Sequence, residues 1–371
     1  MRILIAPDKF KGTLSASQVA KNIAAGLREV LPQADLEIVP VADGGEGTAE
    51  VICQALSGEW VVCEAHDPFG NGISARYAWM KESATAVMEM SEAAGLRRLR
   101  DGALDPLRAT TFGVGEMLRA AARDGAREII VGLGGSVTND GGFGMARALG
   151  VRFFAGEEEL KNGPPELDKL TGISQPKDLH LPPIIAAVDV RNQLLGARGA
   201  TRVFGPQKGV RPEQLKVLER ALRRLADQIA VDLGCDFRNE PGAGAAGGLG
   251  FGLMSFCQAQ LRNGFDVVAD AIDLDRKIAR ADVVVTGEGR FDAQTLEGKG
   301  PAGVARLARR HRKPVFAIVG QADPKVGSGE LFDGIYELAR PPITKIEAVK
   351  LTVELIRERA REAAVRLRGS K

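Results

Sequence analysis

Histidine and paired cysteine are nearly missing from this sequence, and their scarcity excludes whole classes of site. Its 371 residues include three histidines and four cysteines. Three histidines are too few for a histidine-rich metal centre. The cysteines form no CxxC pair and predict neither a zinc site nor a disulfide framework. We interpret them as reduced thiols of a cytoplasmic protein; they are Cys53, Cys63, Cys235 and Cys257.

An excess of one charge and a long apolar run are also absent. The 50 Lys+Arg and 48 Asp+Glu residues give a net charge of +2, so the chain lacks the clustered cations that neutralise the phosphates of nucleic acids or membranes. No apolar run approaches the ~18 residues of a membrane span, and the N-terminal run is too short for a signal peptide. We expect no nucleic-acid partner and no membrane association. Nothing in the sequence specifies an oligomeric state.

Several familiar catalytic motifs are missing as well. There is no GxxxxGKS or GxxxxGKT P-loop, no GxSxG nucleophile turn, and no His-Arg-Asp or Asp-Phe-Gly of the protein-kinase type. Gly242, Gly244 and Gly247 match GxGxxG, but no clear strand precedes them, as a dinucleotide fingerprint requires. In a chain with 45 glycines a single match of this kind is expected by chance.

Short apolar segments alternate with amphipathic ones along most of the chain. Residues 2–6 predict a strand, and Ser15 with Gln18 forms a capping-box pattern that predicts a helix beginning near Ser15. The alternation breaks at residues 59–65 and 73–80, which predict two strands joined by a turn. The glycine- and alanine-rich stretch 239–252 predicts no regular element. The pattern is typical of an α/β fold with largely parallel sheets.

Five polar loops follow predicted strands, where open α/β sheets bind their ligands. Most combine glycine, which lets backbone N–H groups face an anion, with an acid or base that could hold magnesium or phosphate. Five loops at equivalent positions indicate a functional site better than any one of them does. They are residues 8–13, 43–48, 132–142, 189–192 and 286–292.

Phosphoryl transfer fits these loops best. The reaction needs cations on the phosphates, carboxylates for Mg²⁺, backbone donors, and a base or orienting group for the attacking hydroxyl. Lysines are available at Lys9, Lys11 and the 204–209 loop that contains Lys208. Carboxylates are available at Asp43, Asp189 and Asp292.

At these residues the sequence resembles the bacterial type I glycerate kinase family. The resemblance runs from residue 1 to about 365 and is carried by residues 6–16, 42–48, 134–142, 204–209, and 286–289 through 298–299. It implies ATP-dependent phosphorylation of D-glycerate, usually to 2-phosphoglycerate, with ATP and Mg²⁺. One departure is Gln193, where relatives often have proline; it affects a turn and no catalytic group.

The resemblance also implies two dissimilar α/β domains, one Rossmann- or flavodoxin-like, with the active site in the cleft between them. Together with the broken alternation, it leads us to expect one discontinuous domain formed by residues 1–66 and 285–371. Residues 67–284 would then form an inserted second α/β domain.

Roles carried over from the family are hypotheses, one residue at a time. We rank Asp189 first as the base, because a carboxylate at the end of a strand can accept a hydroxyl proton without moving. Asp43 and Asp292 are the competing bases or magnesium ligands, and Lys11 and Lys208 are assigned to phosphate charge. Arg290 is assigned to the glycerate carboxylate through a bidentate contact. Further substrate contacts are Asp8 and Asn192, and the expected nucleotide-binding residues are Gly134, Gly135, Ser136, Asn139, Asp140, Gly287 and Glu288.

Other functions stay open at this point. A glycerate 3-kinase would give 3-phosphoglycerate from the same substrates. An NAD-dependent 2-hydroxyacid dehydrogenase is disfavoured, because the chain lacks a strand-adjacent fingerprint and a convincing histidine–carboxylate pair. A non-catalytic sugar-acid sensor would lose a charged residue in at least one loop, yet all five loops keep theirs.

Overall fold

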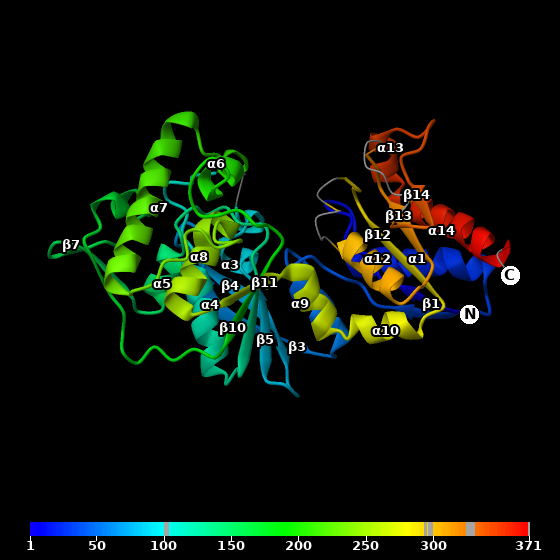
Figure 1. Cartoon of the computed structure of the whole chain (residues 1–371), viewed down its shortest axis with the longest axis horizontal. Helices are drawn as coiled ribbons and strands as arrows, with labels where there is room; N and C mark the ends of the chain where they lie inside the picture. Colours follow the sequence, from blue (N-terminus) through cyan, green and yellow to red (C-terminus); the bar gives the residue numbers. More distant parts are fainter. Residues whose placement is uncertain (100–103, 293–294, 296–299, 324–330, 370–371) are drawn as a thin grey trace. The chain divides into compact units, whose positions relative to one another are not determined.

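The computed structural model describes residues 1–99, 104–292, 295, 300–323 and 331–369 (Figure 1). It divides the chain into two compact units. One combines Met1–Asp43 with Phe265–Lys371, and we call it the split unit. The other is the continuous segment Gly44–Gly264, which we call the central unit. The family motif at residues 298–299 lies outside the described residues.

The split unit is built on a five-stranded parallel sheet. Its strand order is β14-β13-β12-β1-β2, and each neighbouring pair is parallel. Because all the strands run the same way, the loops that follow them leave from one edge of the sheet. The strands are β1 (Arg2–Ile5), β2 (Asp35–Ile38), β12 (Val283–Glu288), β13 (Val315–Val319) and β14 (Gly334–Glu337).

Alternate residues of this sheet enter different faces, as the pleat of a strand requires. Ile3 and Ile5 join a core that also includes residues of α1 (Ala16–Val30) and α14 (Thr352–Gly369). A Cβ on Gly26 of α1 would lie only 2.3 Å from the carbonyl oxygen of Arg357, so these two helices pack backbone against backbone. The other helices are α9 (Gly264–Ala271), α10 (Leu274–Arg280), α12 (Gly300–Arg310) and α13 (Lys345–Lys350).

The central unit contains a six-stranded mixed sheet in the order β11-β10-β6-β5-β4-β3. The pairs from β5 to β11 are parallel, whereas β3–β4 and β4–β5 are antiparallel. β3 therefore runs in the same direction as β5. The strands are β3 (Glu59–His66), β4 (Gly72–Met80), β5 (Thr85–Glu89), β6 (Glu128–Gly132), β10 (Ile184–Val188) and β11 (Gln260–Asn263).

Helices and a smaller antiparallel sheet complete the central unit. The small sheet has the order β8-β7-β9, from β7 (Arg152–Ala155), β8 (Glu158–Glu159) and β9 (Gly172–Ser174). The longest helix of this unit is α7 (Pro212–Asp232). The other helices are α2 (Thr48–Ala55), α3 (Ser91–Ala94), α4 (Phe112–Arg123), α5 (Phe143–Ala148), α6 (Ala200–Phe204) and α8 (Ala245–Cys257), with 3-10 turns η1 (Leu96–Arg98), η2 (Pro164–Lys169) and η3 (Pro206–Lys208).

The observed architecture confirms the expected α/β fold with mostly parallel strands. The capping box of Ser15 and Gln18 is present at the start of α1. The expected limit at 66/67 differs from the division seen here, because β3 pairs along its length with β4 and so belongs to the central unit. The limit at 284/285 also differs, since α9 and α10 fall almost entirely in the split unit. No helix in the described part of the chain is long and apolar enough to cross a membrane.

The glycine- and alanine-rich stretch departs from expectation by forming helix α8. The helix is interrupted at Ala246, Gly247 and Gly248, all of which have left-handed backbone conformations. Space explains the two glycines, because a Cβ on Gly247 would lie 2.0 Å from the carbonyl oxygen of Thr138 and one on Gly248 would lie 2.9 Å from the Cα of Gly141. The interruption lets α8 pack directly against the 132–142 loop.

Candidate active site loops

Loops of the split unit bring Asp8 and the end of β12 together. The Asp8 N–H donates to the carbonyl oxygen of Gly287 at 2.8 Å, and the Asp8 side chain is buried with the residue only 6% exposed. A Cβ on Gly300 would lie 3.1 Å from Asp8 Oδ2, so the start of α12 also closes around this carboxylate. Glu288, the last residue of β12, is likewise buried. Three of the expected residues, Asp8, Gly287 and Glu288, therefore share one edge of this sheet.

Two carboxylates of the split unit already lie beside cations of the same unit. Lys9 Nζ lies 3.6 Å from Asp43 Oδ1. Arg290 Nε lies 3.3 Å from Asp292 Oδ2, and the arginine side chain is 72% exposed. The exposed guanidinium has further N–H donors that can reach an anion in solution. Lys11 is exposed at the rim of a cavity of about 140 Å³ that is also lined by Lys345.

In the central unit, two of the expected loops touch through bare backbone. A Cβ on Gly134 would lie 2.5 Å from the Cα of Gly45, and one on Gly132 would lie 2.7 Å from the carbonyl oxygen of Gly44. Gly135 has φ +72°, and a Cβ there would lie 2.8 Å from Glu46 Oε1. Side chains at positions 132 and 134 would push the loops apart. Glycine is thus required here for close backbone approach.

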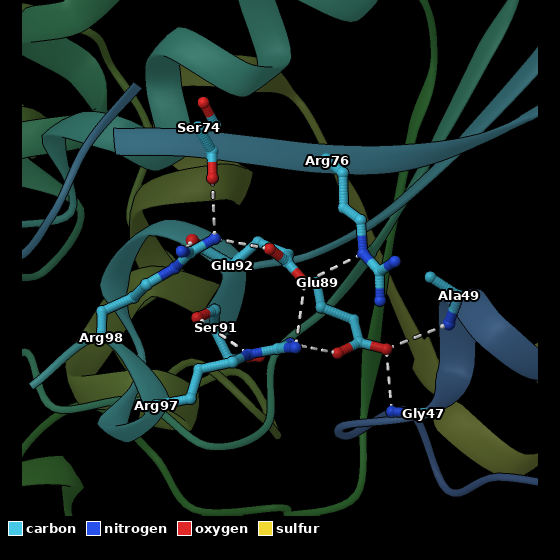
Figure 2. Close-up of polar contacts among 9 residues, drawn as sticks. All are labelled: Gly47, Ala49, Ser74, Arg76, Glu89, Ser91, Glu92, Arg97 and Arg98. Carbon is cyan, nitrogen blue, oxygen red and sulfur yellow. Dashed lines mark hydrogen bonds and ion pairs between the residues drawn. The ribbon is translucent and has the colours of Figure 1, made fainter. Parts of the chain in front are cut away.

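Glu89, at the end of β5, binds the backbone where the 43–48 loop enters helix α2 (Figure 2). Its Oε1 accepts from the N–H of Gly47 at 2.8 Å and of Ala49 at 3.2 Å. Helix α2 starts at this point with no capping side chain of its own, and Gly47 is left-handed with φ 95°. A buried carboxylate from a neighbouring strand therefore does the work of an N-cap, where negative charge also suits the helix dipole.

A second carboxylate extends this network on the same side of the sheet. Arg97 bridges Glu89 and Glu92, and Arg98 binds Glu92 at 2.7 Å. Figure 2 shows Arg76 reaching Glu92 from β4, with a distance of 3.7 Å. Sequence patterns did not point to these residues, because none lies in a glycine-rich loop. A signal was available in the acids that end β5 and begin α3.

Asp140 organises the loop between β6 and α5 from inside the protein. It is fully buried, and its carboxylate accepts from the N–H and hydroxyl of Thr111 at 2.8 Å. It also accepts from the N–H groups of Gly142 and Gly144 at 3.1 Å. The start of α5 is therefore occupied by an acid of the chain itself. Burial raises the pKa of Asp140, and the four hydrogen bonds oppose that shift.

The exposed part of this loop is its first half. Gly134, Gly135 and Ser136 are partly exposed, whereas Asn139 is fully buried and its amide donates to Thr201 Oγ1 at 3.0 Å. Of the residues expected to bind nucleotide, the first three can be reached from solvent. Asn139 and Asp140 support the loop from behind.

Lys208 is also buried behind this loop. Only 2% of the residue is exposed, and its Nζ donates to the carbonyl oxygen of Thr138 at 2.7 Å. Burial lowers the pKa of Lys208 to about 7, although the nearby Asp140 carboxylate raises it. The Lys208 amino group thus supports the loop from inside the protein. The direct phosphate contact expected for Lys208 stays a prediction.

Asp189 lies at the same sheet edge as the glycine loops. It follows β10, whose residue Ala187 pairs with Gly132 of β6 and lies against Gly44. Asp189 is exposed, so its carboxylate can meet a ligand. Asn192 is turned onto its own loop, because its amide donates to the carbonyl oxygen of Arg198 at 2.7 Å.

The described residues contain no group of three or more His, Cys, Asp or Glu side chains arranged to hold a metal. Magnesium in phosphoryl-transfer enzymes is commonly bound by one or two carboxylates together with substrate phosphates. Asp43 and Asp292 have the oxygen donors that such an ion prefers. They belong to the same unit, and each already lies beside a cation.

Comparison with known proteins agrees with the motifs. A family model described as "Glycerate kinase family" matches residues 3–368. Glycerate kinase of Bacillus subtilis is 39% identical over all of this chain and 99% of its own length. Glycerate 2-kinase of Escherichia coli is 42% identical over 88% of this chain and 87% of its own.

A solved structure is similar over the whole fold. It comes from Salmonella typhimurium LT2 and carries a provisional glycerate kinase 2 name. It aligns with a TM-score of 0.87 and 42% identity, covering 100% of this chain and 99% of that one. These matches confirm the resemblance drawn from the loops. The chain belongs to the glycerate kinase family.

Proposed function

We propose that this protein is an ATP-dependent glycerate 2-kinase that transfers the γ-phosphoryl group of ATP to the 2-hydroxyl of D-glycerate. The observation that carries the proposal is the family match over residues 3–368, together with the relative named glycerate 2-kinase. The glycine-rich loops at the carboxyl edges of both sheets support it, because phosphoryl transfer needs backbone donors, cations and carboxylates more than a covalent nucleophile.

In the central unit, we assign Asp189 as the base that deprotonates the reactive hydroxyl of glycerate. Its exposed carboxylate can accept the hydroxyl proton as the oxygen attacks phosphorus. The partly exposed backbone of Gly134 and Gly135, with Ser136, would donate hydrogen bonds to phosphate oxygens. Behind them, Asp140 and Lys208 would keep the loop in shape.

In the split unit, we assign cationic side chains to bind the phosphates and the substrate carboxylate. Lys11 is exposed and can neutralise phosphate, while the free donors of Arg290 suit the glycerate carboxylate. Asp43 and Asp292 would hold Mg²⁺, which shields the charge of the ATP phosphates when bound. Asp8, buried beside Gly287 and Glu288, would shape the same edge.

A coupled assay of ADP release with Mg-ATP and D-glycerate tests the reaction, and phosphorus NMR of the product tests the regiochemistry. We expect 2-phosphoglycerate. A 3-phospho product would refute the assignment of the hydroxyl but keep the kinase. Glycerate-induced stabilisation without ADP release would favour the sensor, and reduction of NAD by glycerate would favour the dehydrogenase.

The assignment of the base needs a matched pair of variants. Asp189→Asn keeps the shape of the side chain but removes its basicity, and we expect turnover to fall about 100-fold or more. Asp178→Asn changes another exposed aspartate of the same unit and should leave turnover unchanged. Full turnover in Asp189→Asn would exclude Asp189 as the base.

A further inference from the structure

The central unit has a second concave surface that is rich in cations. A cavity of about 380 Å³ opens between the end of β3, the segment before α4, α5, and the segment before η2. Four basic side chains line it, and no carboxylate does so among the described residues. None of its lining residues belongs to the catalytic set above. The basic residues are His66, Arg108, Arg147 and Lys161.

Arg147 is the unusual member of this group. Its guanidinium is half-buried, packed over the rings of Phe112 at 5.7 Å and Phe143 at 5.4 Å. It donates to the carbonyl oxygen of Lys161 but forms no ion pair in the described part of the chain. Burial lowers the pKa of Arg147, and the more distant carboxylates of Glu159, Glu166 and Asp140 only partly compensate. A half-buried guanidinium with several unused donors suits an external anion.

The other cations differ in how far they are engaged. Arg108 is exposed, lies over the ring of Phe69 at 5.9 Å, and forms no ion pair with any described residue. Lys161 lies 3.5 Å from Glu159. His66 is held by Glu116, with Nδ1 at 2.9 and 3.0 Å from the two carboxylate oxygens. The two arginines are therefore the main groups left to bind a ligand.

We propose that this cavity is a second ligand site that binds the phosphate group of a small molecule. Two guanidinium groups offer paired N–H donors whose geometry matches phosphate oxygens. The rings of Phe69 and Phe112 form an apolar wall beside them, and the volume is near the lower end for small-molecule sites. A phosphate monoester with a short carbon chain would use both parts; inorganic phosphate would use the arginines alone.

Isothermal titration calorimetry at about physiological ionic strength tests this inference without relying on turnover. The probes are glycerol 2-phosphate, inorganic phosphate and uncharged glycerol. We expect both phosphates to bind and glycerol not to bind. Tighter binding of glycerol 2-phosphate identifies an ester as the ligand class, whereas equal affinities identify free phosphate.

Variants separate this site from the catalytic loops. Arg108→Ala alters an exposed residue and should weaken phosphate binding about tenfold, as loss of charge-assisted hydrogen bonds predicts. Arg147→Met should weaken it at least as much. Arg223→Ala changes an exposed arginine on α7, outside both this cavity and the proposed active site, and should bind as the wild type does. Unchanged binding in Arg108→Ala and Arg147→Met, or an equal loss of binding in Arg223→Ala, would overturn the proposal.

Discussion

Replacing Lys208 with methionine is expected to flatten the pH dependence of stability between about pH 7 and 10. In the folded protein burial lowers the pKa of Lys208 from 10.5 to about 7. The unfolded chain keeps the proton until the ordinary lysine pKa, so unfolding takes up a proton across this range. The free energy of unfolding then rises by ~1.4 kcal/mol per pH unit. Below the folded pKa both states are protonated, and the full cost of burying the charge is present.

From pH 7 to 9 this gain amounts to about 3 kcal/mol at most. Methionine has a similar length and no charge, so it should remove the gain while filling the same space. Urea unfolding at a series of pH values measures the slope. Tryptophan fluorescence is the suitable probe, because both tryptophans, Trp60 and Trp79, lie in the central unit that contains Lys208.

Comparison with a matched variant isolates the contribution of Lys208. Lys216→Met removes an exposed lysine from α7 and should keep the wild-type slope. Burial raises the pKa of Cys63 to about 11 and of Cys257 to about 12, but these thiols titrate equally in all three proteins. A slope in Lys208→Met equal to that of the wild type would refute the reasoning, since Lys208 would then not change its proton affinity on folding.

Three further substitutions test the loops. Gly134→Ala would place a Cβ 2.5 Å from the Cα of Gly45 and should abolish most of the kcat/KM for glycerate. In the control Gly72→Ala, the added Cβ meets open space and kcat/KM should not change. Equal kcat/KM values in the two variants would contradict the close approach of the loops. Glu89→Gln removes the charge that caps α2 and binds Arg97, and should lower the free energy of unfolding in urea by about 1–3 kcal/mol. Asp140→Ala leaves four buried donors without their acceptor and should cost about 3–5 kcal/mol, measured the same way; a change below about 1 kcal/mol would argue against its supporting role.

Local patterns predicted much of the fold. The capping box at Ser15 and Gln18 placed the start of α1, and the strands predicted at 2–6, 59–65 and 73–80 match β1, β3 and β4 to within one residue at each end. The same reasoning failed at α8, where glycine and alanine usually signal irregular backbone. There the helix is stabilised by tertiary contact, since close packing against residues 138–141 requires small side chains.

The candidate site was predictable in its loops but not in their support. Loops such as 132–142 were visible because glycine and acid residues cluster after a strand. The role of Glu89 could not be predicted from local sequence. Its partners Gly47 and Ala49 lie 42 and 40 residues earlier in the chain, and only the folded sheet brings them together. The burial of Lys208 could not be predicted from its sequence context either. Lys208 adjoins a glycine as an exposed loop lysine would, yet it is enclosed by the protein.

The split unit imposes an order of events on synthesis. Strand β1 must pair with β12, and the hydrogen bond from Arg2 to Asp282 joins residues 280 positions apart. At about 5–20 residues per second, a ribosome needs roughly 15 to 55 seconds to make that stretch. The central unit, complete by Gly264, can fold during this interval. During the same interval the apolar residues of β1 and α1 stay exposed, because β12 has not yet been made. The first 43 residues are therefore the part of the nascent chain most in need of protection from aggregation.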